Sequence, residues 1–356
     1  MRTASVTFPL CVAACGVGST LTLAIAPGRA PSALRASPPE PPAAPDLRLA
    51  APILDCEAPA TDDYPAACGE HRALASAYDD CVPARDFQEW GCLILDASAR
   101  LCEDGQPFAM TVVVEASSVS LDCRGQSIAH TEGLRRPGIR FPKTRSLDQV
   151  TIEHCSIRDT GFAGIEILRN FRTADGDALG HRHVVVRDVS IDSGKYGVYI
   201  GTRSRSVTLE RVRVTSALEV GVYIDADSTE VRLTEVVVSG TRRREGIAVD
   251  SATEITIEES TTRNNRGGGI RLYHNCGELR GSVCPVTRGR GASNNVIRRN
   301  RIEDGLIVAS RQGERYQAGL CSDLSGEGGA MRDIARGNRI VENVFVSPAS
   351  WASLSL

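Results

Sequence analysis

The sequence contains few aromatic residues, few histidines and methionines, and no excess of positive charge. Phenylalanine, tyrosine and tryptophan make up 4% of the chain, so aliphatic side chains must fill most of any core. The net charge of -3 argues against a nucleic-acid partner, because phosphate binding requires a clear basic excess. With 3 methionines and 6 histidines, the chain is poor in the thioether and imidazole ligands that copper prefers, which disfavours a copper-loading function.

Two further patterns are missing. No Cys-x2-Cys pair occurs, which disfavours a structural zinc site. The apolar run near the N-terminus is shorter than the ~20 residues that a membrane-spanning helix needs, which disfavours an uncleaved anchor. Residues 1–26 instead indicate an export signal, because Arg2 precedes an apolar stretch.

Within this signal, VAAC at 12–15 resembles the lipobox of bacterial lipoproteins, and the resemblance makes Cys15 the lipidated residue. In that case the protein contacts a membrane only through this lipid. The alternative is signal cleavage near Ala26, because small apolar residues continue past Cys15. All of these alternatives place the body of the protein outside the cytoplasm, in the periplasm, on the outer membrane or in the extracellular space.

Cysteine use agrees with export. The cysteines that follow the signal region are even in number and concentrated in the N-terminal part, which predicts disulfides in an oxidising compartment. Their pairing cannot be deduced from their order. They are Cys56, Cys68, Cys81, Cys92, Cys102, Cys123, Cys155, Cys276, Cys284 and Cys321.

The remaining chain divides by composition. Residues 27–52 are rich in proline and alanine without periodicity, which is typical of an extended tether. Residues 53–110 are expected to form a small Cys-rich, partly helical cap. Residues 111–346 carry a repeat, and residues 347–356 form a C-terminal tail.

The repeat consists of a glycine with alternating apolar residues, followed by two further short apolar segments. The second and third segments start five residues apart in each repeat, whereas the first-to-second connection varies in length. Within each segment, apolar and polar residues alternate with period two, which is typical of a strand with one buried face. The glycine-led segments are GIRF at 138, GIEI at 164, GVYI at 197 and 221, GIAV at 246, GIRL at 269 and GLIV at 305.

This pattern resembles the right-handed parallel β-helices of the pectate-lyase-like superfamily, and VEASSVSLDCRGQSI at 114–128 resembles the customary first coil. The resemblance implies an all-β, single-stranded solenoid of about eight coils with three short strands per coil. It assigns no catalytic residue, because the Asp-Pro-His-Asp motif of alginate epimerases and the paired-Asp and Gly-His-Gly motifs of polygalacturonases are absent. The fold itself supports many functions.

Asparagines replace small apolar residues in the last coils, and we expect them to stack and bond amide to amide in a structural role. They are Asn295, Asn300, Asn338 and Asn343. The long connections at 168–183, 273–294 and 309–337 all leave the same edge of the first strand, so they should form a wall beside it. Because Cys276, Cys284 and Cys321 lie in the last two, a disulfide within that wall is expected.

The outward positions of the first strand therefore face this wall and give the candidate site. Tyrosine rings suit sugar faces, arginine suits a uronate carboxylate, and aspartates one coil apart suit acid–base chemistry or a calcium ion. The candidate catalytic residues are Asp225, Asp250, Arg271, Tyr223, Tyr273 and His274, the candidate substrate-binding residues are Glu166, Tyr199 and Arg140, and the candidate Ca2+ ligands are Asp225 and Asp250.

These residues predict a monomeric exported protein that binds or acts on a polysaccharide, most simply an acidic one. Three chemistries fit: a lyase or C5-epimerase, in which Arg271 or Ca2+ neutralises the uronate while Tyr223, Tyr273 or His274 moves the proton, and a glycoside hydrolase that uses the two aspartates. The alternative is a non-catalytic carbohydrate-binding or structural module. A third interpretation is that this face has no binding role. The tyrosines and charged side chains would then only keep the surface soluble, and the aspartates would cap turns.

Overall fold

The computed structural model describes residues 68, 72–87, 89, 91–130, 136–143, 145–167, 180–192, 194–273, 292–308 and 337–346. The export signal with Cys15, the tether, the C-terminal tail and His274 lie outside these residues, as do most of the three long connections and Cys56, Cys276, Cys284 and Cys321. Within the described residues the chain forms three parallel sheets and two short 3-10 helices. No helix there combines the length and the apolar composition needed to cross a bilayer.

The first sheet contains the glycine-led segments of the repeat. Its strands, in spatial order, are β1 (Arg72–Leu74), β2 (Gly91–Leu95), β4 (Met110–Val114), β7 (Ile139–Arg140), β10 (Ala163–Ile167), β13 (Tyr196–Ile200), β16 (Val220–Ile224), β19 (Ile247–Asp250), β22 (Ile270–Tyr273) and β25 (Leu306–Val308).

The second and third sheets follow the same order along the stack. The second contains β3 (Ala99–Arg100), β5 (Val119–Asp122), β8 (Asp148–Glu153), β11 (Arg182–Arg187), β14 (Arg205–Glu210), β17 (Arg232–Thr234), β20 (Thr256–Glu258), β23 (Val296–Arg298) and β26 (Arg339–Val341). The third contains β6 (Ser127–Ala129), β9 (Ser156–Arg158), β12 (Ser190–Asp192), β15 (Arg213–Thr215), β18 (Val237–Ser239), β21 (Thr261–Arg263), β24 (Arg301–Ile302) and β27 (Val344–Phe345).

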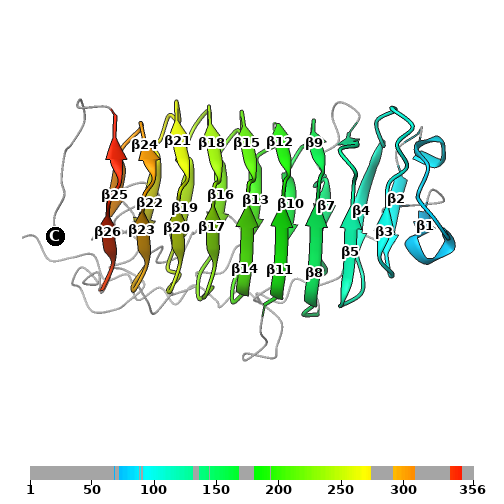
Figure 1. The fold of residues 1–356 in the computed structure, drawn as a ribbon, viewed down its shortest axis with the longest axis horizontal. Helices are drawn as coiled ribbons and strands as arrows, with labels where there is room; N and C mark the ends of the chain where they lie inside the picture. Colours follow the sequence, from blue (N-terminus) through cyan, green and yellow to red (C-terminus); the bar gives the residue numbers. More distant parts are fainter. Residues whose placement is uncertain are drawn as a thin grey trace, which may run out of the picture. The chain divides into compact units, whose positions relative to one another are not determined.

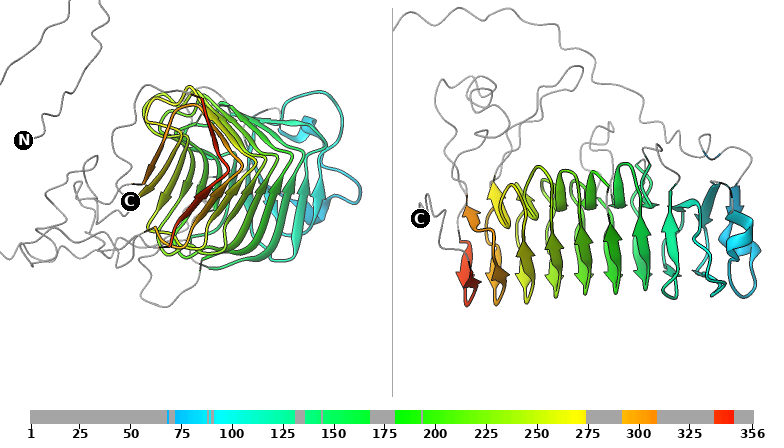
Figure 2. Two further views of the ribbon diagram at one scale, coloured as in Figure 1. Left: turned by 60° about the vertical axis from the view of Figure 1, so that its left-hand side comes forward. Right: turned by 90° about the horizontal axis from the view of Figure 1, so that it is seen from above.

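From β4 onward each coil contributes one strand to each sheet, and each strand pairs with its equivalent in the next coil (Figure 1). The two GVYI segments pair in register, with Val198 opposite Val222 and Tyr199 opposite Tyr223. The fold is therefore the three-sided parallel β-helix that the repeat predicts. Figure 2 shows the same coils from two further sides.

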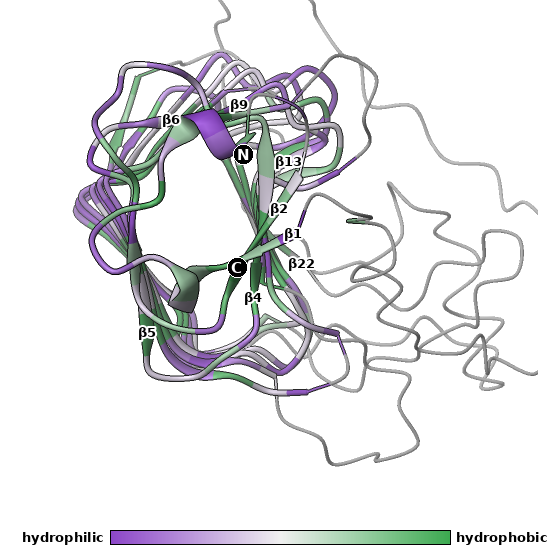
Figure 3. Ribbon diagram, turned by 90° about the vertical axis from the view of Figure 1, so that its right-hand side faces the viewer, coloured by the Kyte–Doolittle hydropathy of each residue, from purple (hydrophilic) through white to green (hydrophobic). Residues whose placement is uncertain are grey.

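The interior is a continuous stack of valine, isoleucine and leucine side chains from all three sheets. In Figure 3 the coils superpose around this interior, with hydrophilic residues concentrated at the corners. Val222 and Ile224 of β16, for example, are fully buried between their equivalents in β13 and β19. Burying a side chain of this kind stabilises the fold by about 1.5–3 kcal/mol relative to leaving it exposed.

The repeated glycine is required by close packing near the start of each strand of the first sheet. A Cβ atom on Gly221 would lie 2.2 Å from Cγ1 of Val238 in the third sheet and 2.7 Å from the carbonyl oxygen of Gly246 in the next coil. Both distances are well inside van der Waals contact, so no side chain fits at this position.

The fixed spacing between the second and third strands has a different cause. One residue at that corner adopts the left-handed conformation in coil after coil, with φ between 51° and 58°, and none of these residues is glycine. A single left-handed residue turns the chain sharply, which explains why this connection does not vary. The residues are His154, Asp188, Arg211, Glu235, Glu259, Arg299 and Glu342.

The N-terminal region departs from the expected boundaries. β1, β2 and β3 lie within residues 53–110, where a partly helical cap was expected, and they pair in parallel with the later coils. The segment from Cys68 to Cys81 contains β1 and the one-turn 3-10 helix η1 (Ala75–Ala77), and the other 3-10 helix is η2 (Ala84–Phe87). The coil stack therefore begins before residue 111.

Among the described residues, three disulfides join neighbouring segments near the start of the stack, namely Cys68–Cys92, Cys81–Cys102 and Cys123–Cys155. Their presence is consistent with an exported protein, because such bonds persist in oxidising compartments.

The asparagines of the last coils bond mainly to backbone groups. Oδ1 of Asn295 accepts the backbone N–H of Ile255, and Oδ1 of Asn300 accepts that of Ser260. One amide-to-amide bond is present as well, from Nδ2 of Asn300 to Oδ1 of Asn343 (3.0 Å). The ladder therefore satisfies buried backbone groups at the corners, in addition to linking its own members.

Candidate functional site

The outward positions of the first sheet form one column, as the repeat alignment predicts. Each residue lies directly opposite the next in the parallel ladder. The column runs Arg140, Glu166, Tyr199, Tyr223, Ala248, Arg271 and Ile307.

This face is far less exposed than the strand pattern predicts. Arg140 is 7% exposed, Glu166 3% and Tyr223 7%, and Ala248 is fully buried. Strand β11 of the second sheet, by contrast, alternates buried and exposed positions. The expectation of a solvent-facing row of side chains is therefore wrong for most of this column.

Arg140 and Glu166 form an ion pair, with 3.6 Å between Nε and Oε2. Both side chains are almost completely buried, where an unpaired charge would be costly, and each charge compensates the other. Arg140 was expected to bind substrate, but its guanidinium already lies against a carboxylate of the protein.

The tyrosines form a compact aromatic cluster. Tyr199 and Tyr223 stack with their ring centroids 5.0 Å apart and their planes inclined by 25°. Tyr196 packs against both, at 5.0 Å and 5.9 Å, and Phe162 packs edge-on against Tyr196 at 5.6 Å. The ammonium group of Lys195 lies 5.1 Å from the Tyr196 ring centroid, within cation–π range. Apart from Tyr223, these side chains are partly exposed, so the cluster has a solvent-facing edge.

Two of the tyrosines donate hydrogen bonds to aspartates in the following coil. The hydroxyl of Tyr199 donates to Oδ2 of Asp225 (3.0 Å), and that of Tyr223 donates to Oδ2 of Asp250 (2.5 Å). The same relation therefore occurs twice: a tyrosine on one coil bonds an aspartate on the next coil, two positions further along. It fixes the rings and compensates the carboxylates.

The aspartates are both buried, Asp225 at 1% and Asp250 at 0% exposure. Asp225 also accepts hydrogen bonds from the Thr202 hydroxyl (2.9 Å) and the Ala226 backbone N–H (2.8 Å), and Asp250 accepts one from the Ser251 hydroxyl (3.0 Å). Hydrogen bonds of this kind allow a carboxylate to remain buried.

The register places Asp225 and Asp250 on neighbouring coils, because Ile224 lies opposite Val249. Within the described part of the chain, the group of three residues with ligand atoms close enough to hold a metal ion does not include either aspartate. A calcium site at Asp225 and Asp250 therefore stays a prediction.

Arg271, Tyr273 and His274 complete the predicted set. Nε of Arg271 donates to the carbonyl oxygen of Gly267 (2.8 Å), and the backbone of Tyr273 lies opposite Asp250. His274 lies outside the described residues.

Sequence reasoning missed the position just before the repeated glycine. Tyr196 and Val220 pair there in register, and the carbonyl oxygen of Glu245 accepts the N–H of Gly221, which places Glu245 beside them. Glu245 is fully buried, and Tyr196 links the aromatic cluster together. Aligning the residue before each glycine, in addition to those after it, would have identified Tyr196 and Glu245.

Comparison with known proteins gives one family match and several distant structural likenesses. The family model described as right handed beta helix region matches residues 122–284 and 180–349, which together make up more than half of the chain. No curated protein matches the sequence.

A lacto-N-biosidase from Eubacterium ramulus is 13% identical with a TM-score of 0.44, covering 71% of this chain and 49% of the enzyme. This chain therefore spans about half the length of that enzyme. An alginate lyase from Paenibacillus sp. str. FPU-7 is 13% identical with a TM-score of 0.36, covering 78% and 98% of the two chains. The A-module of a mannuronan C-5 epimerase from Azotobacter vinelandii is 10% identical with a TM-score of 0.24, covering 79% and 90%.

These likenesses are too distant to assign a substrate or a reaction. The family model, in contrast, agrees with the observed coils over the same residues. The chain belongs to the right-handed β-helix family.

Proposed function

We propose that the outward face of the first sheet binds a glycan chain at the aromatic cluster. The observation that carries the proposal is the partly exposed edge formed by Phe162, Tyr196 and Tyr199, with the Lys195 ammonium beside it. Aromatic rings with one apolar and one polar side suit sugars, which present C–H faces and hydroxyl edges.

The buried aspartates support this role by holding the rings in place. Asp225 accepts the Tyr199 hydroxyl and Asp250 accepts the Tyr223 hydroxyl, so the stacked pair loses little further freedom when a ligand arrives. A surface ordered before binding has a smaller entropic cost on association.

Lys195 favours a glycan with carboxylate or sulfate groups. Its side chain is partly exposed beside the rings, whereas Arg140 is buried against Glu166. An anionic substituent on a sugar stacked against Tyr196 would lie close to this ammonium, where opposite charges attract. We therefore propose an acidic polysaccharide as the partner, met in the periplasm, on the outer membrane or outside the cell.

Glycoside hydrolysis is a second candidate, favoured by the placement of Asp225 and Asp250. Neighbouring strands lie about 4.8 Å apart, which is close to the roughly 5–5.5 Å that separates the carboxyl groups of retaining glycosidases. Because both carboxylates are buried, a substrate reaches them only if the groups above them move. Lyase or epimerase chemistry would instead require Arg271 to neutralise a uronate beside Tyr223.

Binding is tested by titrating the purified protein with neutral, uronate-containing and sulfated glycans in a calorimeter. We expect Tyr196→Ala and Lys195→Ala each to weaken binding of the preferred glycan about tenfold, equivalent to ~1.4 kcal/mol. Arg213→Ala removes an exposed cation from the third sheet and serves as the control. Unchanged affinity in both Tyr196→Ala and Lys195→Ala would refute the proposed surface.

Catalysis is tested in the same samples by following reducing ends and unsaturated-uronate absorbance. Hydrolysis predicts new reducing ends without that absorbance, and loss of activity in Asp225→Asn and Asp250→Asn. Asp227→Asn is the matched control, because Asp227 is exposed in the turn just after Asp225. Binding without either product would identify a binding module, and activity that survives both substitutions would exclude these carboxylates.

A further inference from the structure

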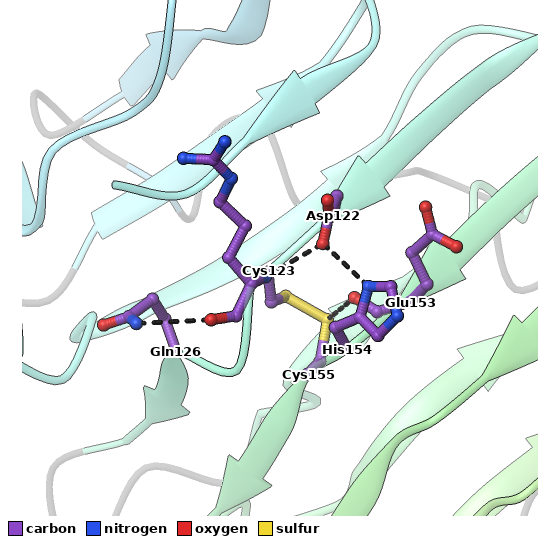
Figure 4. Close-up of a disulfide and its surroundings, with 7 residues drawn as sticks. Asp122, Cys123, Gln126, Glu153, His154 and Cys155 are labelled. Carbon is purple, nitrogen blue, oxygen red and sulfur yellow. Dashed lines mark hydrogen bonds and ion pairs between the residues drawn. A yellow bond between two sulfur atoms is a disulfide. The ribbon is translucent and has the colours of Figure 1, made fainter. Parts of the chain in front are cut away.

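A second cluster of chemically active side chains lies on another part of the solenoid, at the corner between the second and third sheets. Asp122 ends β5, Glu153 ends β8 directly opposite it, and His154 is the left-handed corner residue that follows. Nδ1 of His154 lies 3.0 Å from Oδ1 of Asp122 (Figure 4). One ligand atom from each of the three residues lies within 4.8 Å of the other two.

A disulfide holds the two coils together at this point. Cys123 follows Asp122 and Cys155 follows His154, and the bond between the two cysteines joins the coils beneath the cluster (Figure 4). Both cysteines are buried. The backbone that carries the carboxylate and the imidazole is therefore fixed by a covalent link, which is the preorganisation that a tight ion site requires.

A cavity of about 400 Å³ opens beside the cluster, and Asp122 and Glu153 form part of its wall. Asp79 and Asp80 line the same cavity, and Arg100 is the cation among its lining residues. The charged residues of the wall are thus mostly acidic, and the space leaves room for water molecules around an ion.

The second imidazole nitrogen of His154 faces another carboxylate. Nε2 lies 3.9 Å from Oδ2 of Asp188, and Arg211 holds Asp188 in place through hydrogen bonds of 2.7 Å and 2.9 Å. Metal-binding histidines commonly have a carboxylate behind the ring, which orients it and increases its basicity.

We propose that Asp122, Glu153 and His154 bind a divalent transition-metal ion of the Zn2+ type. One imidazole nitrogen with two carboxylate oxygens is a ligand set that zinc accepts, and water from the cavity would complete the coordination. The ion would lie between Nδ1 of His154 and Oδ1 of Asp122, and the imidazole would then carry its hydrogen on Nε2, toward Asp188. Glu153 also contacts Arg187 through Oε2 at 2.5 Å, and would use its other carboxylate oxygen for the metal.

The chain contains a matched comparison in His183 and Asp148. They form the same kind of pair, with Nδ1 of His183 2.6 Å from Oδ1 of Asp148, and His183 is likewise exposed. Among the residues that the structure describes, no third ligand joins this pair. Removal of His183 therefore controls for loss of an exposed imidazole–carboxylate contact.

The test is a calorimetric titration of chelator-treated protein with Zn2+. We expect one saturable site in the wild type, at least tenfold weaker binding in His154→Ala and Asp122→Asn, and affinity within twofold of wild type in His183→Ala. Thermal unfolding in chelator checks that each variant is folded, and His154→Gln serves as a second variant if His154→Ala is not.

Two results would overturn the proposal. Absence of a saturable site in the wild type excludes the metal, and wild-type affinity in folded His154→Ala or His154→Gln excludes this location. Neither result bears on glycan binding, because the aromatic cluster lies on the first sheet and this corner joins the second and third.

Discussion

Replacing the Cys123–Cys155 disulfide by a pair of valines gives a direct measure of how much the cross-link stabilises the stack. Valine is the appropriate replacement because the next coils carry Val189, Val212 and Val236 at the corresponding corner position. The double variant Cys123→Val/Cys155→Val therefore keeps an apolar side chain that the corner accommodates, and removes only the covalent bond.

The expected loss follows from the length of chain that the bond closes. The two cysteines are 32 residues apart, and the loop-entropy relation gives a destabilisation of about 4 kcal/mol on removing a cross-link of this length. This is a large effect against the 5–15 kcal/mol by which domains are typically stable. It should lower the urea midpoint without a change of fold.

The assay is urea unfolding of the wild type and the double variant, each measured with and without reductant. Without reductant we expect the double variant to be less stable by about 3–4 kcal/mol. With reductant the two proteins should agree within about 1 kcal/mol, because neither then contains this bond. A difference below ~1 kcal/mol without reductant, or an equal difference with it, would refute the entropic argument.

Three further outcomes are expected. Tyr223→Phe should lower the free energy of unfolding by about 1.5–3 kcal/mol, because it removes a donor from the buried carboxylate of Asp250; a loss under ~0.5 kcal/mol in urea unfolding would mean that this bond contributes little. The Arg205 guanidinium lowers the pKa of Glu230 to about 2 from 4.5, so the stability it contributes is complete above pH 4.5 and is lost as pH falls toward 2. Thermal melts over that range should show a smaller decrease in Glu230→Gln than in the wild type, and equal decreases would contradict the assignment. Gly221→Ala should prevent folding or cost more than ~3 kcal/mol, because the added methyl group meets a valine side chain at 2.2 Å; a soluble variant with a wild-type melting temperature would show that the packing can relax.

The fold was predictable because its rules are local and repeated. The glycine that aligned the repeats is the residue that the close packing demands, as Gly221 shows. The apolar and polar residues that alternate after this glycine determine the register of neighbouring strands. The pairing of Tyr199 with Tyr223 could therefore be predicted from the sequence. The start of the stack was harder to predict, because β1 and β4 contain no glycine and Gly91 of β2 is out of register with the later glycines.

The candidate site was predictable in position but not in environment. Strand periodicity says that Arg140 and Asp250 point away from the core, yet it cannot say what covers them, and both are buried. The bond from Tyr223 to Asp250 runs diagonally from one coil to the next, so it appears only when the coils are stacked. The cluster at His154 was missed for the same reason, since its acidic partner Asp122 lies a whole coil earlier in the chain.

The in-register pairing of Gly197–Ile200 with Gly221–Ile224 has a consequence for how such a chain lengthens or shortens. Residues 197–220 form one complete turn of the solenoid, because position 221 lies directly above position 197. Excising this segment joins Tyr196 to Gly221 at an equivalent position and leaves each remaining strand with a partner of the same kind. A whole turn is therefore the segment whose removal leaves every remaining strand with an equivalent partner.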